Sequence, residues 1–577
     1  MKPDGYCARI GGSAAPRGIA PPGPEEGGVT VQTMIGNAAV MTGRRCGTLH
    51  LPTDAGLVLG TLFDRSGKRV GRVSPETVAS WIATSGKALI ERYWGAYLAI
   101  LSTPQGTLLV RDPSGLFPCY YRHSAGGILA ASDLAWFDAT GVQARGICWP
   151  EIHAQLQYSS LRTRRTAIAD VYELLPGETL QVQAEGIVVE QLWTPYAFAT
   201  GHAPPLTFEE AADRLRRVAD LTIGAWARLF ARPLVEISGG LDSSIVAAIA
   251  ARVAPGIEAV TWRGGDADLD ESGYARILAG HLGIPLHRVA LDSAMVDLHR
   301  SAAGYLPRPS GRSFAQANDR QGLQLARQLG SDAFLVGAGG DTILWYFNTA
   351  APALDRLRIE GVAGFLRTVG DLAQMCGVPW SQSLLVALRK RLQRRPLPWP
   401  ANTGFLSADA QPPAAEGEHP WWPPPPDTLP GTRAYVRALI QLSDHHEYHE
   451  RATHAPVIPA LVSQPIVEAC LAMPSWLSCT GGANRAVARA AYANALPEAI
   501  VARRSKGGFD GFVHDLLERN RTTAREMLLD GTLAREGWLD REAILAVLQD
   551  PAPIAPHASL RLLRLVAVEA WLNSVRR

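Results

Sequence analysis

A glycine-rich turn at residues 238–243 is the first feature whose residue types suit a chemical role. Residues 234–237 predict a short buried strand, and apolar residues recur every four positions from Ile245 to Val253, which predicts one face of a helix. A strand that enters a helix through glycines presents backbone amides and the positive end of the helix dipole to an anion. The residues expected to line this anion site are Ser238, Gly239, Gly240, Leu241, Asp242, Ser243 and Ser244.

Asp242 is unexpected in a turn that binds a bare anion, because its carboxylate would repel the ligand. Its presence therefore predicts a bridging cation, and Mg²⁺ is the cation that proteins hold through carboxylates and substrate phosphates. The same hexapeptide would also suit a simple strand-to-helix turn, since Gly-Gly and Asp-Ser both serve turns and helix caps. The sequence contains no Gly-x-x-x-x-Gly-Lys-Ser/Thr loop, which excludes a P-loop that transfers the γ-phosphate.

Two later segments contain residues that would complete such a site. Residues 333–336 predict another buried strand, which leads into a second turn of glycines and an acid. Lys506 lies in a basic segment at 503–509, and a lysine there can neutralise charge that develops on phosphate oxygens. Taken alone, this segment would favour a solvated basic turn over a site residue. The residues of the second turn are Gly337, Gly339, Gly340 and Asp341.

The hexapeptide matches the Ser-Gly-Gly-x-Asp-Ser PP-loop of the ATP pyrophosphatase superfamily, and the order of the later segments resembles the asparagine-synthetase family within it. This resemblance implies ATP and Mg²⁺ as cofactors. It also implies that Asp242 and Asp341 are the metal ligands, and that these two acids and Lys506 are the catalytic groups.

The resemblance extends to the strand predicted at 257–262, where it places Val260 and Trp262 in the nucleotide site. An acidic cluster at 268–271 follows, before the next predicted helix. These acids would either serve a Mg²⁺ site or stabilise the N-terminus of that helix, and the sequence favours neither.

Residues 31–200 resemble the glutamine-hydrolysing domain of asparagine synthetase. The resemblance rests on Arg-Asp-Pro-Ser-Gly-Leu-Phe at 111–117 and Leu-Leu-Pro-Gly-Glu at 174–178. In the family the nucleophile is a cysteine directly after the initiator Met, whereas here Lys2 follows Met1 and the nearest cysteine is Cys7. The Asn-Gly-Glu glutamine-binding segment is missing too. We therefore expect a degenerate domain that does not hydrolyse glutamine.

The expected fold class is α/β in two parts. An N-terminal glutaminase-like (Ntn-type) domain, sheet-rich and α+β, spans 31–200, and a PP-loop domain spans 201–577 with a parallel α/β sheet and a helical C-terminal part. Residues 1–30 are rich in Gly, Pro and Ala and are predicted to be a mobile N-terminal tail. The Pro- and Trp-rich stretch 395–430 is expected to be a loop, either a clamp for the substrate or a disordered insertion.

Bulk composition limits the other functions. A chain of 577 residues requires two domains or more, and a net charge of +2 favours neither nucleic acid nor a membrane as a partner. The seven cysteines are scattered with no Cys-x-x-Cys pair, which predicts neither a zinc site nor a disulfide framework. There is no apolar signal region, so a cytoplasmic location is expected.

Loss of the glutaminase removes the internal ammonia supply, so the nucleophile is expected to be an amine of the substrate itself. Ala338 stands where asparagine synthetase has Glu and where β-lactam-forming synthetases have Tyr, and Val462 stands where asparagine synthetase has Asp. The segments at 350–353 and 459–468 resemble those of the lasso-peptide cyclases. A mixed His/Glu segment offers candidates for the general base, although such a segment also suits a solvated face: His445, His446, Glu447 and Glu450.

The resemblance to lasso-peptide cyclases implies a specific reaction. The enzyme would adenylate an Asp or Glu side chain of a leaderless precursor peptide and close a macrolactam with the N-terminal amine. The implied partners are the precursor (core) peptide, a leader-processing protease and a leader-recognition protein. Three alternatives stay open: an asparagine-synthetase-like amidotransferase that uses free ammonia, a β-lactam-forming synthetase, and a nucleotide-binding scaffold without catalysis.

Overall fold

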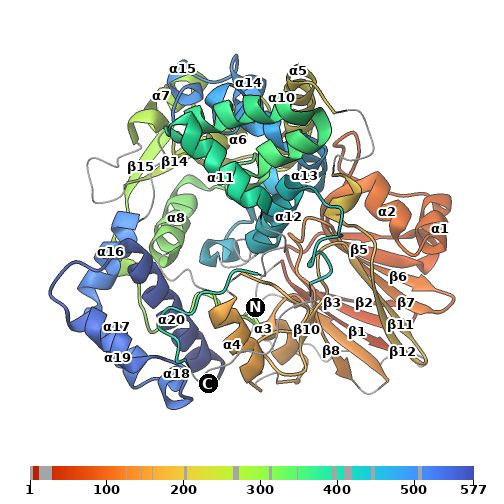
Figure 1. Cartoon of the computed structure of the whole chain (residues 1–577). Helices are drawn as coiled ribbons and strands as arrows, with labels where there is room; N and C mark the ends of the chain where they lie inside the picture. Colours follow the sequence, from red (N-terminus) through yellow and green to blue (C-terminus); the bar gives the residue numbers. More distant parts are fainter. Residues whose placement is uncertain are drawn as a thin grey trace.

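Three β-sheets organise the computed structural model of the chain, two of them antiparallel and one parallel (Figure 1). The structure describes residues 4–11, 29–124, 126–143, 146–158, 160–199, 205–263, 272–310, 315–346, 348–392, 399–408, 419–443, 449–504 and 510–576. Because antiparallel and parallel sheets arise from different chain connections, this division separates the two expected domains. The mixed α/β fold class is confirmed.

The two antiparallel sheets each have six strands and pack face to face. The first has the order β10-β8-β9-β1-β3-β2 and the second β12-β11-β7-β6-β5-β4. Strands of the first sheet are β1 (Tyr6–Gly11), β2 (Val29–Ile35), β3 (Ala38–Gly43), β8 (Tyr120–Ser124), β9 (Gly127–Ala131) and β10 (Tyr172–Glu173). Strands of the second are β4 (Thr48–His50), β5 (Gly56–Asp64), β6 (Tyr93–Thr103), β7 (Gly106–Arg111), β11 (Glu178–Gln183) and β12 (Gly186–Gln191).

Strand β1 corrects the prediction of a mobile tail over residues 1–30. Tyr6, Ala8 and Ile10 alternate into the core between the two sheets, and Cys7 faces the opposite side. The strand is hydrogen-bonded to β3 on one edge and to β9 on the other. A central strand with both faces buried cannot be mobile. Residues 12–28 lie outside the described residues.

The outer faces of both sheets are covered by helices, which gives a four-layered arrangement. Apolar residues of β5, β6 and β7 share a core with α1 (Pro75–Ala83), α2 (Lys87–Arg92) and the parallel sheet. Residues of β1, β3 and β9 share another core with α3 (Leu134–Asp138), α4 (Trp149–Gln157) and the last helices of the chain. Because both faces bury apolar side chains, neither antiparallel sheet would be stable without its helical cover.

The parallel sheet has five strands in the order β15-β14-β13-β16-β17. Its strands are β13 (Pro233–Glu236), β14 (Glu258–Arg263), β15 (Leu286–Ala290), β16 (Ala333–Leu335) and β17 (Val457–Ile458). The connecting helices include α5 (Phe208–Ala227), α6 (Leu241–Ala251), α7 (Ser272–Leu282) and α8 (Ala315–Leu329). Strand β14 lies on one side of β13 and β16 on the other. Ligands of open parallel sheets bind where the strand order reverses in this way.

The remaining helices form the C-terminal part. Helices α16–α20 lie at lower left in Figure 1, beside α4 and away from the parallel sheet. Among the described helices, none is both long enough and apolar enough to cross a membrane. The helices are α9 (Gly340–Ile343), α10 (Ala351–Cys376), α11 (Trp380–Leu392), α12 (Pro430–Leu442), α13 (Gln464–Leu471), α14 (Ala486–Tyr492), α15 (Glu498–Val501), α16 (Asp510–Arg519), α17 (Arg521–Leu529), α18 (Thr532–Arg535), α19 (Arg541–Gln549) and α20 (Pro556–Val575).

The described parts of the predicted loop 395–430 are packed into the protein. The Trp421 ring lies 5.5 Å from that of Trp193 in the N-terminal domain, and Trp399 is buried. The Arg561 guanidinium on α20 donates to the carbonyl oxygens of Asn402 and Gly404 at 3.0 Å each. These tryptophans therefore stabilise the junction between domains and are not free to clamp a substrate.

Candidate active site

The predicted glycine turn lies between β13 and α6, as the sequence indicates. Gly239 has φ of +68°, and a Cβ atom there would lie 2.9 Å from the carbonyl carbon of Tyr274. Only glycine satisfies both constraints. The Ser243 hydroxyl accepts a hydrogen bond from the Ser238 amide at 3.2 Å, and the Ser238 hydroxyl accepts one from the Gly240 amide at 3.2 Å. The turn is therefore held open before the N-terminus of α6.

The second glycine turn packs directly on the first turn of α6. A Cβ atom on Gly337 would lie 2.7 Å from the Ser243 nitrogen, and one on Gly340 would lie 2.6 Å from Cγ of Asp242. These approaches explain why the turn is rich in glycine, because any side chain would separate the two segments. They place Asp341, at the start of α9, beside Asp242. The structure thus brings together the two predicted metal ligands.

Arg485 joins the two acids, and sequence reasoning did not find it. Its Nη1 atom donates to Oδ1 and Oδ2 of Asp242 at 2.9 and 3.0 Å and to Oδ1 of Asp341 at 3.0 Å. The guanidinium carbon lies 4.8 Å from the ring centroid of Tyr346. Its only signal in the sequence is a pair of arginines four residues apart, Arg485 and Arg489, and such a pair is common on helices.

The convergence of two carboxylates on one cation fits a Mg²⁺ site. No group of three or more His, Cys, Asp or Glu that would enclose a metal occurs in the part of the chain that the structure describes. Two carboxylates are nevertheless what Mg²⁺ requires when substrate phosphates and water supply the other ligands. Asp242 and Asp341 are therefore suited to hold Mg²⁺ only together with a phosphate-containing substrate.

Two further arginines concentrate positive charge beside the turn. Arg503 lies over the Tyr274 ring, 4.2 Å from its centroid, and donates to the Ser238 carbonyl at 3.4 Å. Arg489 donates to the carbonyl of Arg503 at 2.8 Å and so positions the segment that carries it. Burial, followed by the charge of Arg485, lowers the pKa of Arg489 to about 10. The guanidiniums of Arg485, Arg489 and Arg503 together suit an anionic ligand.

The other predicted site residues either lie away from the two glycine turns or fall outside the described residues. The side chain of Leu241 is buried in the core, so only its backbone reaches the turn. Val260 and Trp262 pack in the cluster between the sheet and α8, with Ala326 and Phe334, and not on the α6 face. The Trp262 indole nitrogen is buried without a hydrogen-bond partner among the described residues. Residues outside the described part are Lys506, the acids at 268–271, His445, His446 and Glu447.

Glu450, the described candidate for the general base, is held in an ion pair. Arg300 donates to both of its carboxylate oxygens, at 2.9 and 3.1 Å. A bidentate pair with a guanidinium fixes the orientation of the carboxylate and occupies both of its oxygens. Glu450 therefore stabilises the start of its segment rather than serving as a free base.

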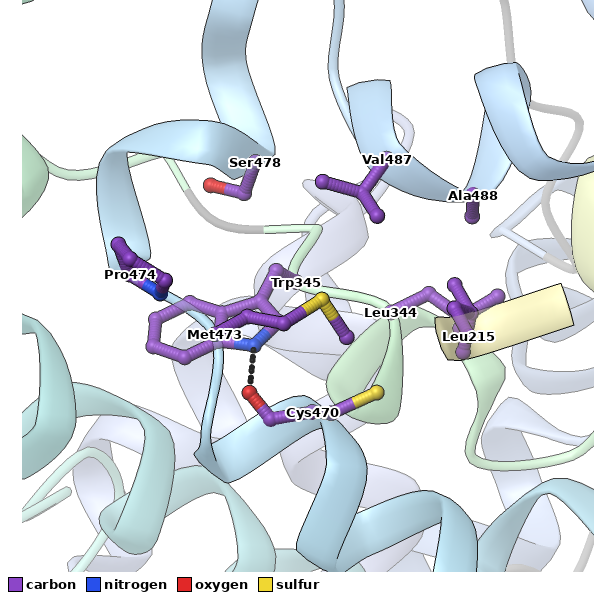
Figure 2. A pocket seen from close by; sticks show the side chains of 9 residues that line it. All are labelled: Leu215, Leu344, Trp345, Cys470, Met473, Pro474, Ser478, Val487 and Ala488. Atoms are coloured by element: carbon purple, nitrogen blue, oxygen red, sulfur yellow. Dashed lines mark hydrogen bonds between the residues drawn. The ribbon is translucent and has the colours of Figure 1, made fainter. Parts of the chain in front are cut away.

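A small apolar cavity lies behind the second turn, between α5, α13 and α14 (Figure 2). Its volume of about 10 Å³ admits no more than one water molecule. Trp345, on its wall, has φ of +64° and donates its indole N–H to the Cys470 carbonyl at 3.2 Å. This cavity is a feature of the packing and cannot hold a substrate. Its lining residues are Leu215, Leu344, Trp345, Cys470, Met473, Pro474, Ser478, Val487 and Ala488.

The glutaminase-like domain offers no activated thiol among its described residues. Burial raises the pKa of Cys7 and of Cys46 to about 12, and that of Cys119 to about 11. Burial also raises the pKa of Cys148. A thiol nucleophile requires a lowered pKa and access to solvent. These cysteines are structural.

Comparison with known protein families identifies both domains from the sequence. Residues 230–573 match the asparagine synthase family, described as "Asparagine synthase", and residues 66–193 match the glutamine amidotransferase domain. No curated protein matches the chain.

Two solved structures share little with the chain. A glutamine phosphoribosylpyrophosphate amidotransferase from B. subtilis is 12% identical over 49% of this chain and 59% of its own, with a TM-score of 0.20. An allosteric regulatory enzyme of purine biosynthesis is 14% identical over 53% of this chain and 67% of its own, with the same TM-score of 0.20. The chain thus spans less than two thirds of the first of these structures. The family match covers more than half of the chain and includes both glycine turns and the Arg485 segment, and the chain therefore belongs to the asparagine synthase family of ATP-dependent, amide-forming ligases.

Proposed function

We propose that this ligase is a lasso-peptide cyclase. It would join an Asp or Glu side chain of a leaderless precursor peptide to the N-terminal amine of the same peptide, with ATP converted to AMP and pyrophosphate. The observation that carries the proposal is the burial of the thiols in the glutaminase-like domain: Cys7 and Cys119 are fully buried, and burial raises the pKa of all four described cysteines. Without a glutaminase, an amine within the substrate is the simplest nucleophile.

The first step is adenylation. A carboxylate oxygen of the peptide bonds to the α-phosphorus of ATP, and the bond from that phosphorus to the bridging oxygen breaks as pyrophosphate leaves. The amides at the N-terminus of α6 and the hydroxyls of Ser238 and Ser243 bind the phosphates. Arg503, fixed on Tyr274, adds positive charge beside them. When held by Asp242 and Asp341, Mg²⁺ would offset the charge of the departing pyrophosphate.

The second step is amide formation. The N-terminal nitrogen of the peptide bonds to the acyl carbon, the bond to AMP breaks, and the ammonium proton passes to a base. Because both reacting groups belong to one chain, the enzyme supplies the rate mainly by holding the peptide folded. Lys506, whose segment follows Arg503 and Arg504 in the sequence, is the residue proposed to neutralise the charge of both steps.

The surroundings of the second turn disfavour a free amino acid as the substrate. Val462 packs against Gly339, where a Cβ atom would lie 2.7 Å from its Cγ2 atom. An apolar side chain in this position cannot pair with the ammonium group of aspartate. Ala338 contributes no acid or base, which disfavours a β-lactam-forming reaction in the same way.

The proposed protein partners require a docking face, and α10 and α11 offer one. Most of the large apolar side chains that are exposed in the described residues lie on these two helices. Exposed apolar side chains gathered in one region mark sites of protein interaction. We propose that the leader-processing protease or the leader-recognition protein binds there. The exposed residues are Ile359, Val362, Leu366, Trp380, Leu385, Val386, Leu388 and Leu392.

The decisive experiment compares two substrates for the purified protein with Mg²⁺ and ATP. One reaction contains a leaderless precursor peptide, and the other contains free aspartate with ammonia. The proposal predicts AMP and a peptide lighter by one water in the first reaction only. Asp242→Asn should abolish both signals, whereas Asp213→Asn, which removes an exposed carboxylate of α5, should leave them unchanged. AMP and asparagine in the second reaction would instead identify an ammonia-dependent asparagine synthetase.

A further inference from the structure

Arg485 occupies the position between the carboxylates where a metal ion is expected. A single nitrogen, Nη1, donates to three oxygens of Asp242 and Asp341, all within 3.0 Å. The arginine side chain is 8% exposed, and Asp242 and Asp341 are 13% and 32% exposed. Two carboxylates that meet at low exposure repel each other unless a cation lies between them. In the absence of substrate, the guanidinium supplies that cation.

The backbone of Arg485 indicates that this contact is specifically maintained. Its φ of +52° lies in the left-handed region, which a residue with a side chain adopts only where the surrounding structure holds it. The contact also spans 243 residues of sequence to Asp242 and 144 to Asp341. Local sequence therefore does not create the arrangement, and the surrounding fold holds it.

The guanidinium has unused hydrogen-bonding capacity. Its Nε atom is buried and donates to no described residue, and its three contacts to the acids all come from Nη1. A buried donor without a partner costs free energy and is expected to bind a ligand when one is present. The planar guanidinium matches the oxygens of a phosphate group, which it can bind through two nitrogens at once.

We infer that Arg485 is a resident counter-cation of the Asp242–Asp341 pair, and that Mg²⁺ displaces it when the nucleotide binds. In the free enzyme the guanidinium keeps the two acids together. With Asp242 and Asp341 holding Mg²⁺, the guanidinium would be released to bind the pyrophosphate portion of ATP. Arg485 is thus a positioning residue of the ATP site. The inference depends on the family membership alone and not on which carboxylate the enzyme activates.

The test measures the binding of Mg²⁺ alone and of pyrophosphate in excess Mg²⁺, both by calorimetry without turnover. Arg485→Gln should bind Mg²⁺ about tenfold more tightly than the native enzyme, because the guanidinium that competes for the same carboxylate oxygens is missing. The same variant should bind pyrophosphate about tenfold more weakly, because the released guanidinium is missing. Arg252→Gln, which removes an exposed ion pair with Asp220 in the same domain, should change neither affinity.

The two affinities separate the possible results. Unchanged or weaker Mg²⁺ binding by Arg485→Gln would overturn the displacement. Tighter Mg²⁺ binding with unchanged pyrophosphate binding would overturn the transfer of the guanidinium to the phosphates. If Arg485→Gln does not fold, Arg485→Lys keeps the charge but loses the planar fork. We expect it to weaken pyrophosphate binding with little change in Mg²⁺ affinity, and native pyrophosphate binding by this variant would also contradict the inference.

Discussion

Replacing Gly340 by alanine should push apart the two acids of the active site. A Cβ atom at this position would lie 2.6 Å from Cγ of Asp242 and 2.9 Å from Cδ1 of Leu461. Carbon atoms in favourable contact are about 3.5–4.0 Å apart, so either the second turn or Asp242 must move by about 1 Å. The movement occurs at the contact that aligns Asp341 with Asp242.

The expected effect is larger on rate than on stability. Overpacking of this kind costs about 1–3 kcal/mol. Misplacing a catalytic group by about 1 Å costs roughly a hundredfold in rate, because the reacting atoms are no longer aligned. We therefore expect Gly340→Ala to form AMP about a hundredfold more slowly while it still folds and melts cooperatively.

The assay is AMP formation with the substrate that supports turnover in the two-substrate comparison, accompanied by thermal melting. Gly273→Ala is the matched control, since a Cβ atom at this position in α7 meets no atom of the described residues within 4 Å. The control should keep native activity and melt no earlier, because alanine is the better helix former. Native AMP formation by Gly340→Ala would refute the close approach of the two turns. A variant that fails to fold would show that the added methyl group destabilises the domain by far more than the cost expected from overpacking.

Two further perturbations test the N-terminal domain. Glu173 lies 2.8, 2.7 and 3.1 Å from Arg111, Arg162 and Arg308, so Glu173→Gln leaves buried positive charge uncompensated and should cost about 3–5 kcal/mol in denaturant melts. Burial alone would raise the pKa of Glu173, but the three guanidiniums lower it to about 2. The ionised Glu173 therefore contributes to the free energy of unfolding at pH values above its unfolded pKa of about 4.5, and this contribution is lost as the pH falls towards 2. In Glu173→Gln the melting temperature should depend less on pH between these two values. Cys7→Ala should leave AMP formation unchanged, and neither the native protein nor this variant should release glutamate from glutamine. Glutamate release that is lost in Cys7→Ala would contradict the structural role of this thiol.

Local sequence predicted the parts of the active site that depend on neighbouring residues. The turn between β13 and α6 follows from glycine at a positive φ and from apolar residues with helical spacing, both of which act within a few residues. The same holds for β14 and β16, whose short apolar runs are typical of buried parallel strands.

Strand β1 shows why the N-terminus was predicted wrongly. Its six residues lie beside a long Gly- and Pro-rich stretch. The composition of that stretch indicates a mobile segment, and a single strand of six residues is too short to change the average composition of residues 1–30. What stabilises β1 is its pairing with β3 and β9, and β9 comes more than a hundred residues later. Pairing with strands that are distant in the sequence is not encoded in the amino-acid types of the strand itself.

What the sequence by itself determined is the type and order of the groups: a glycine turn between a strand and a helix, and later a second glycine turn that ends in an acid. Only the tertiary structure decided how these groups meet. The two glycine turns touch because their strands are neighbours in the sheet, and Arg485 reaches both acids from the position just before α14, far away in the sequence. The physical reason is that backbone conformation is set by a few adjacent residues, whereas the position of a charge between two others depends on long-range packing.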